Sequence, residues 1–106
     1  MTTHAPATLR HFVTYTGVSL PLRLTTPLEA SDLQNRITFY RAYYNAQDQL
    51  TDVEKVVYGE IESSHHYLYH ANGTLQQARI VVVADEETTL MTFAEDGTLL
   101  STETIA

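Results

Sequence analysis

Three segments of this sequence follow one pattern: Tyr44-Asn-Ala-Gln-Asp-Gln-Leu50, Tyr69-His-Ala-Asn-Gly-Thr-Leu75 and Phe93-Ala-Glu-Asp-Gly-Thr-Leu99. Each begins with an aromatic residue, continues through residues typical of turns and ends with a leucine. The segments start 25 and then 24 residues apart, which indicates one supersecondary unit used several times. Because alternating aromatic and aliphatic runs flank each segment, we expect the unit to be a β-hairpin.

The same alternation places the strands that these turns connect. Six strands are predicted, over residues 38–44, 50–61, 65–70, 75–83, 89–93 and 99–105, and Gly59 breaks the second of them. Further turns are expected at residues 62–64 and 85–87. Asn72-Gly73 is the strongest short hairpin signal, and such turns commonly need positive φ. The predicted fold class is mainly β (α+β), an antiparallel β-hairpin meander.

The residues before Thr38 are predicted to add an N-terminal hairpin and one short helix. The hairpin strands are expected at residues 9–15 and 18–24, and Pro21 places the second strand at an edge or beside a bulge. Thr26-Pro27-Leu28-Glu29 has the pattern of a capping box, which predicts a helix from Pro27 to Asn35 that covers part of a sheet. We therefore expect a single domain, with a flexible tail at 1–8, the hairpin and helix at 9–37, and the meander at 38–106.

The recurrence of an aromatic strand, a glycine turn and a leucine resembles the YD-type and MORN-type hairpin repeats. The resemblance covers about the last two thirds of the chain. The first copy departs from it, since Asp48 stands where the other copies have Gly73 and Gly97. Such repeats are mainly structural or partner-binding, so the resemblance implies no catalytic chemistry. The whole chain also resembles small uncharacterised bacterial proteins.

Composition excludes several classes of function. The chain of 106 residues has a formal net charge of −7, which argues against binding to nucleic acid. It contains no cysteine, which excludes disulfides and thiolate metal sites. The absence of cysteine suits a protein in a reducing compartment. We find no secretory signal and no apolar run of about 18 residues, so a cytoplasmic protein without membrane association is expected.

Both faces of the predicted sheet carry apolar side chains. Alternate residues of a strand share a face, so Tyr40 lies opposite to Phe39 and Tyr43 in the same strand. One hairpin and one helix can cover one face, which leaves Phe39, Tyr43, Val57 and Leu68 on the other. An apolar patch of that size is unusual on a monomer. We therefore expect a homodimer or a stable complex with another protein through this face.

No motif predicts a metal, a cofactor or a catalytic residue. The histidines His66 and His70 share a strand face but lie about 13 Å apart at ~3.3 Å per residue, too far for one ion. Arg41 stands on an aromatic face, where it can stack on rings, form an ion pair or receive an anion. No serine nucleophile, phosphate loop or dinucleotide motif is present, because the glycines form no Gly-rich loop.

Two functions remain open. The first is a non-catalytic interaction or accessory protein that acts through a β-sheet face. The second is a small-molecule-binding domain or cofactor-independent enzyme, which a closed pocket of about 300 Å³ or more would favour. The residues expected to bind the ligand or partner are aromatic, basic or imidazole side chains of the sheet: Tyr40, Arg41, Tyr43, Tyr58, His66, Tyr67 and Tyr69.

Overall fold

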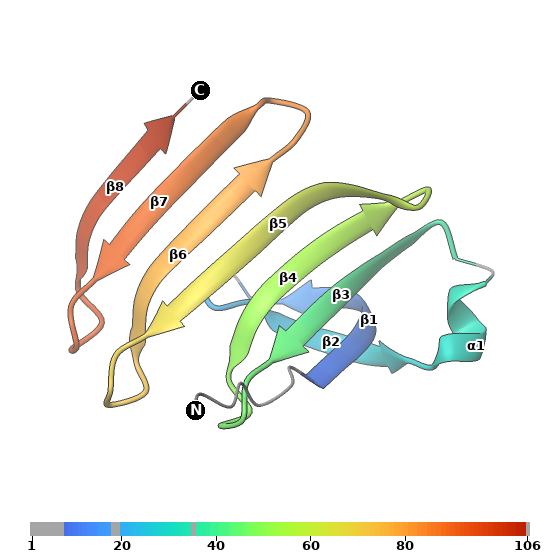
Figure 1. Ribbon diagram of the computed structural model, residues 1–106, viewed down its shortest axis with the longest axis horizontal. Coiled ribbons are helices and arrows are strands. Elements are labelled where there is room, and N and C mark those ends of the chain that lie inside the picture. Colours follow the sequence, from blue (N-terminus) through green and yellow to red (C-terminus); the bar gives the residue numbers. More distant parts are fainter. Residues whose placement is uncertain (1–7, 18–19, 35, 106) are drawn as a thin grey trace, which may run out of the picture.

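One antiparallel sheet contains every strand that the structure describes. The computed structural model describes residues 8–17, 20–34 and 36–105. Its elements are β1 (Thr8–Thr16), β2 (Arg23–Leu28), α1 (Ala30–Leu33), β3 (Thr38–Tyr44), β4 (Leu50–Val57), β5 (Glu60–Tyr69), β6 (Leu75–Val82), β7 (Glu87–Phe93) and β8 (Leu99–Ile105). The strand order is β2-β1-β3-β4-β5-β6-β7-β8 (Figure 1). The mainly β fold class and the antiparallel meander are thus confirmed.

The three repeated segments form turns of the same geometry. In each, the backbone N–H of the residue after the aromatic donates to the carbonyl four positions later, in the pairs Asn45–Gln49, His70–Thr74 and Ala94–Thr98 at 3.0, 2.8 and 2.8 Å. Positive φ falls on one position, occupied by Asp48, Gly73 and Gly97 at 60°, 90° and 93°. A register shift in the flanking strands accompanies each turn. The repeat is therefore a three-residue hairpin loop with a bulge, rather than a two-residue turn.

The turn between β4 and β5 lies at Tyr58-Gly59. Both residues have positive φ, 51° and 77°, as a two-residue hairpin turn of type I′ requires. The turn predicted at residues 62–64 is wrong. The strand predicted at 50–61 is two strands, because the break expected at Gly59 is the turn itself. Glu62, Ser63 and Ser64 belong to β5, where both serines pair with β4 and β6. Glu62 lies at the register shift toward β4, and its carbonyl accepts a hydrogen bond from the backbone N–H of Val83 at 3.0 Å. The serines suggested a turn locally, but pairing with β4 and β6 outweighs that preference.

The predicted helix is shorter and begins later than expected. Pro27 lies in β2, opposite Phe12 of β1, and Thr26 beside it has a φ of 59°. The helix α1 covers only Ala30–Leu33, and the carboxylate of Asp32 accepts a hydrogen bond from the backbone N–H of Glu29 at 3.0 Å. The Thr26 cap is therefore wrong, while Asn35 lies outside the described residues. Proline is tolerated in β2 because this strand is an edge. Figure 1 shows α1 beside the sheet and not over a face of it.

The second strand of the N-terminal hairpin is also displaced along the sequence. It begins at Arg23, whereas the prediction was 18–24; residues 18 and 19 lie outside the described part of the chain. Leu20 and Leu22 precede the strand and still pack against the buried core, as Leu24 does from within it. The alternating leucines thus indicated burial correctly, although only part of the run is a strand.

The core cluster lies on one face of the sheet, which we call the inner face, and the buried Val56 lies outside this cluster. Its buried members are Phe12, Ala42, Leu50, Val53, Tyr67 and Ala78. The β1–β2 hairpin lies behind the meander in Figure 1, and the backbone N–H of Leu22 donates to the Tyr67 hydroxyl at 3.3 Å. The sheet therefore curls so that its N-terminal hairpin covers part of the inner face. The opposite side of the meander is called the outer face.

Candidate functional site

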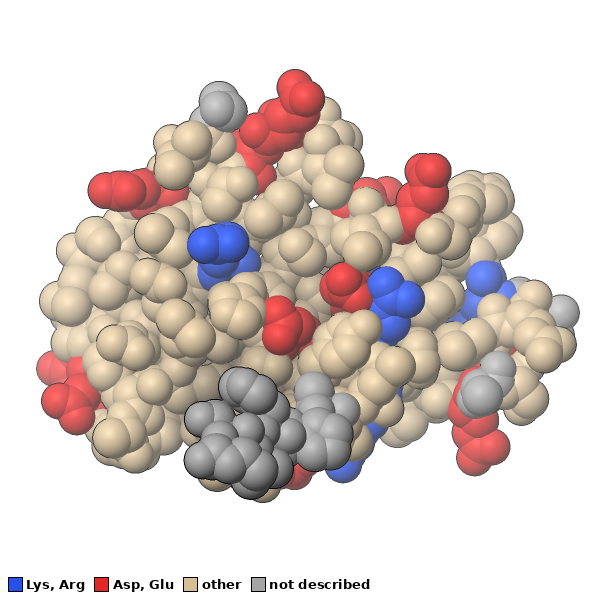
Figure 2. Space-filling model, viewed as in Figure 1, with Lys and Arg blue, Asp and Glu red and all other residues tan. Residues whose placement is uncertain are grey.

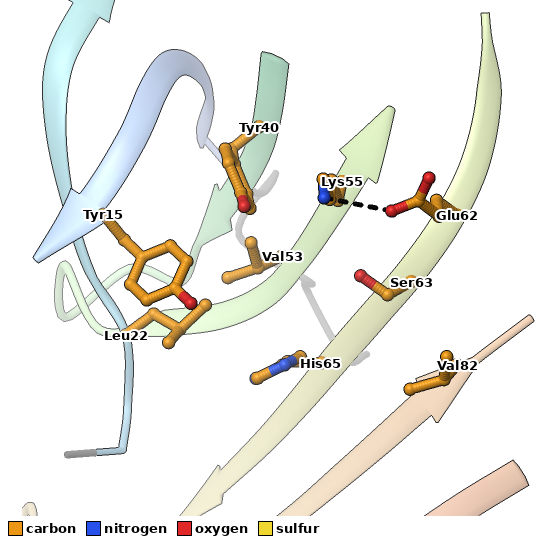
Figure 3. A pocket seen from close by; sticks show the side chains of 9 residues that line it. All are labelled: Tyr15, Leu22, Tyr40, Val53, Lys55, Glu62, Ser63, His65 and Val82. Atoms are coloured by element: carbon orange, nitrogen blue, oxygen red, sulfur yellow. Dashed lines mark ion pairs between the residues drawn. The ribbon is translucent and has the colours of Figure 1, made fainter. Parts of the chain in front are cut away.

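A cleft of about 250 Å³ opens on the inner face beside the N-terminal hairpin (Figure 3). The hairpin contributes one wall, and strands β3 to β6 contribute the floor and the other wall. The lining combines apolar, phenolic, charged and imidazole side chains: Tyr15, Leu22, Tyr40, Val53, Lys55, Glu62, Ser63, His65 and Val82. The cleft is half open and smaller than the closed pocket that would favour a small-molecule site.

His65 is held in one tautomer by Tyr67. Its Nδ1 lies 2.6 Å from the Tyr67 hydroxyl, which also accepts the N–H of Leu22. Tyr67 is only 1% exposed, and burial raises the pKa of its phenol, so the hydroxyl keeps its proton. That proton must go to an acceptor, and Nδ1 is the one within reach. Nε2 of His65 therefore carries the imidazole hydrogen.

The imidazole of His65 is also held neutral and is open on one side. Burial lowers the pKa of His65, which disfavours the imidazolium. Among the described residues, no buried side-chain nitrogen or oxygen lacks a hydrogen-bond partner. Since no described protein group bonds to Nε2 of His65, this atom is not completely buried, and the ring lies at the cleft (Figure 3). The cleft thus presents a fixed N–H donor.

An ion pair closes the other end of the cleft. Nζ of Lys55 lies 3.0 Å from Oε1 of Glu62, across β4 and β5. The hydrogen bond to Glu62 is the largest cause that raises the pKa of Lys55, while burial raises the pKa of Tyr40 nearby. The cleft therefore contains one positive and one negative side chain that neutralise each other.

The predicted binding residues do not form one site, because they divide between the two faces and a turn. Tyr40, Tyr67 and Tyr69 lie on the inner face, in or against the core, and the Tyr69 hydroxyl donates to the Leu50 carbonyl at 2.6 Å. Burial raises the pKa of Tyr69 to about 12. Tyr58 lies in the β4–β5 turn and is 77% exposed. Only Tyr40 of the predicted set lines the cleft.

The other predicted residues, Arg41, Tyr43 and His66, lie on the outer face. The Arg41 guanidinium pairs with Glu54 at 2.7 Å, and Nδ1 of His66 lies 2.6 Å from Asp52. A shallow hollow of about 300 Å³ is lined by Tyr43 and His66 together with Asp52, Glu54, Ser64 and His65. Figure 2 shows this side of the molecule, with side chains of both signs side by side near its middle. The ion-pair interpretation of Arg41 is the one that the geometry fits.

His65, Lys55, Glu62 and Tyr15 line the cleft but were not among the predicted site residues. The sequence pattern could have identified His65 as an inner-face residue, because strand alternation puts it on the same face as Tyr67 and Tyr69. Lys55 and Glu62 are seven residues apart, and they meet only because the turn lies at Tyr58-Gly59 and not at 62–64. Tyr15 reaches the cleft only through the curl of the sheet.

One protein-family model matches this chain. The model of the family of unknown function DUF6156 matches residues 4–102. The chain belongs to this family. No curated protein and no solved structure matches the chain.

The far edge of the sheet is formed by β8, which pairs only with β7 among the described strands. All seven of its residues are exposed. Three of them are large and apolar, since Leu99, Leu100 and Ile105 are 48%, 62% and 59% exposed. An edge strand of this kind has unpaired backbone N–H and C=O groups beside apolar side chains, which makes it a template for pairing with another strand.

Two further features of the described residues bear on partners. No group of three or more histidine and acidic side chains among them could hold a metal ion. No helix in residues 8–17, 20–34 and 36–105 is long and apolar enough to cross a membrane.

Proposed function

We propose that this chain is a non-catalytic interaction protein that binds through the β8 edge of its sheet, and that its partner is a second copy of itself. The observation that carries the proposal is the open edge of β8, all of whose residues are exposed. An added strand would satisfy the unpaired backbone groups of β8 and cover its apolar side chains. The sequence predicted an interaction through a sheet face, whereas three features of the folded chain favour the edge.

The two edges of the sheet differ in their protection against pairing. Edge strand β2 contains Pro27, which has no N–H, and Thr26 at positive φ, which disrupts the regular ladder. Strand β8 contains neither proline nor a basic residue, and threonine and isoleucine in it favour extended backbone. Its single charge is Glu103. Only the β8 edge is therefore suited to accept a strand.

The sheet faces are less suited to a partner. The outer face carries the Arg41–Glu54 and His66–Asp52 pairs near its middle, and burying them would remove water from charged groups. The inner face is partly covered by the β1–β2 hairpin. Val57, which was expected at the centre of an apolar face, lies at the end of β4 beside the turn.

A two-fold axis through Thr102 gives β8 a complementary copy of itself. In this antiparallel register Leu99 lies opposite Ile105, Leu100 opposite Thr104, and Ser101 opposite Glu103 of the second copy. All seven residues then have a partner, and no two like charges are directly opposed. Moving the axis to Glu103 would oppose two carboxylates, which is destabilising. The Thr102 register is the one we propose.

Cysteine cross-linking tests both the dimer and its register. The natural chain has no cysteine, so each single-cysteine variant has one thiol. In the proposed dimer the two Thr102 Cα atoms are about 4.5–5.5 Å apart, within the range of a disulfide. We expect Thr102→Cys to form a disulfide-linked dimer on mild oxidation, read by non-reducing electrophoresis. The unmodified chain should show the dimer mass in analytical ultracentrifugation.

Thr104→Cys is the matched control. In the same register the two copies of residue 104 are offset by four positions, roughly 14 Å at ~3.4 Å per residue, so no disulfide should form. A monomer at every concentration would refute the proposal. So would a dimer in which Thr102→Cys stays reduced, since another surface would then hold the two copies.

A further inference from the structure

The inner-face cleft lies away from the β8 edge and plays no part in the proposed interaction. Although it is half open and smaller than the closed pocket expected of a small-molecule site, it combines a hollow, apolar walls and a polar group. Its volume of about 250 Å³ equals that of roughly eight liquid water molecules at ~30 Å³ each. A ligand of one ring with a small substituent would fit that space.

The walls favour a planar, apolar body. The rings of Tyr15 and Tyr40 meet edge to face, with centroids 5.7 Å apart and an interplanar angle of 80°. Leu22, Val53 and Val82 complete the apolar lining (Figure 3). Aromatic side chains attract another ring in offset or edge-to-face arrangements. A ring inserted beside the two tyrosines would contact both the aromatic rings and the aliphatic side chains of the cleft.

The polar groups favour an uncharged ligand that accepts a hydrogen bond. Nε2–H of His65 is a donor whose direction is fixed by the bond from Tyr67 to Nδ1. An anionic ligand is disfavoured because the Lys55 ammonium is already paired with the Glu62 carboxylate, which would repel the anion. The net charge of −7 on the protein adds to this repulsion. A cation would meet the Lys55 ammonium in the same way. A neutral carbonyl group suits the His65 donor and leaves the Lys55–Glu62 pair intact.

We infer that this cleft binds a small, uncharged, planar molecule whose carbonyl oxygen accepts a hydrogen bond from Nε2 of His65. The ring of the ligand packs on Tyr15 and Tyr40, and the Lys55–Glu62 pair excludes charged analogues. The site thereby provides a binding function separate from the β8 edge.

Benzamide is a suitable probe, because it is a neutral ring with one carboxamide. Benzoate and benzylamine have the same ring with a negative or a positive group. We expect benzamide to shift the NMR signals of His65 Nε2 and of Tyr15 and Tyr40 in a saturable manner, with a Kd on the order of 1 mM for so small a ligand. Benzoate and benzylamine should bind at least about tenfold more weakly, a difference of about 1.4 kcal/mol.

Two variants and one control locate the site. His65→Phe removes the donor, and Val82→Phe fills the cleft from β6 without changing the imidazole; each should weaken benzamide binding at least about tenfold. His66→Phe changes the neighbouring residue on the outer face and should leave binding unchanged. Absence of saturable shifts with benzamide overturns the inference. Equal binding of the three probes, or undiminished binding to Val82→Phe, also overturns it, and none of these results depends on the dimer.

Discussion

At the scale of single residues, His65 and His66 show how strand alternation separates neighbours. His65 points into the inner face, where Tyr67 binds it and the cleft surrounds it. His66 points to the outer face, is exposed and pairs with Asp52. Two adjacent and chemically identical side chains therefore have different roles. The partly buried imidazole of His65 has its pKa lowered by burial.

The lowered pKa of His65 predicts a dependence of stability on pH. Unfolded His65 takes up a proton near its ordinary pKa of 6.5, whereas the folded residue resists protonation. The stability it contributes is therefore present above pH 6.5 and is lost as the pH falls toward the lowered value. We expect the difference in unfolding free energy between the natural chain and His65→Gln to shrink from pH 7.5 to pH 5.

Urea denaturation across this pH range measures the effect. Burial and the Arg41 charge also lower the pKa of His11, but that residue is present in both proteins and cancels in the comparison. Parallel stability profiles for the two proteins would show that His65 titrates normally in the folded state.

At the scale of elements, the three repeated turns share one backbone conformation but not one residue at its left-handed position. Gly73 and Gly97 adopt positive φ at little cost, whereas Asp48 has a side chain that resists it. The ion pair of Asp48 with Arg10 is long, at 3.7 Å, and exposed, so it contributes little in compensation. The first turn is therefore the weakest of the three by this criterion.

Substitutions at the left-handed positions should change stability in opposite directions. We expect Asp48→Gly to raise the free energy of unfolding by about 0.5–1 kcal/mol, because it removes the left-handed strain. Gly73→Val should lower it by about 1 kcal/mol or more. Space is not the cause, since the nearest atom to an added Cβ at Gly73 is Nε2 of Gln49 at 4.0 Å.

Chemical denaturation provides the measurement for these variants. Ala71→Val in the same loop is the matched control, because Ala71 does not have positive φ. It should cost less than about 0.5 kcal/mol, as surface substitutions usually do. An equal loss for Ala71→Val and Gly73→Val would indicate that side-chain bulk, and not backbone conformation, limits this turn.

At the scale of the whole molecule, the proposed dimer brings two acidic chains together. Each carries a formal net charge of −7, so the copies repel one another before they pair. In the Thr102 register the two Glu103 carboxylates lie on a diagonal, with backbones about 7–8 Å apart. The apolar residues and backbone groups of β8 must overcome this repulsion.

Salt should therefore strengthen the dimer. Raising NaCl from 0.05 to 0.5 M shortens the screening length to a few ångströms, and we expect the dissociation constant to fall at least about threefold. Glu103→Gln should tighten the dimer at low salt and reduce the salt effect. Sedimentation equilibrium measures both. A dimer that salt weakens would instead be held by ion pairs between the copies, contrary to the β8 pairing.

Local signals in the sequence were sufficient to predict the repeated hairpins. The strands at 38–44 and 99–105 have their predicted bounds, because turn chemistry and side-chain alternation act over a few residues. The same signals failed at Tyr58-Gly59, where a tyrosine occupies a left-handed position that sequence patterns assign to glycine or asparagine. They also failed at Pro27, whose place in an edge strand depends on its partner Phe12.

The sequence by itself thus determined the meander, the repeated turn and the alternation of side chains along each strand. It could not determine which side of that alternation is buried, because burial depends on segments that meet only in the folded chain. Leu22 and Tyr67 are separated by 45 positions, and their hydrogen bond marks where the N-terminal hairpin crosses the inner face. The curl of the sheet brings them together and forms the cleft, so that His65 and not His66 lies on the face that the hairpin covers. The strand order leaves β8 open at the edge of the sheet.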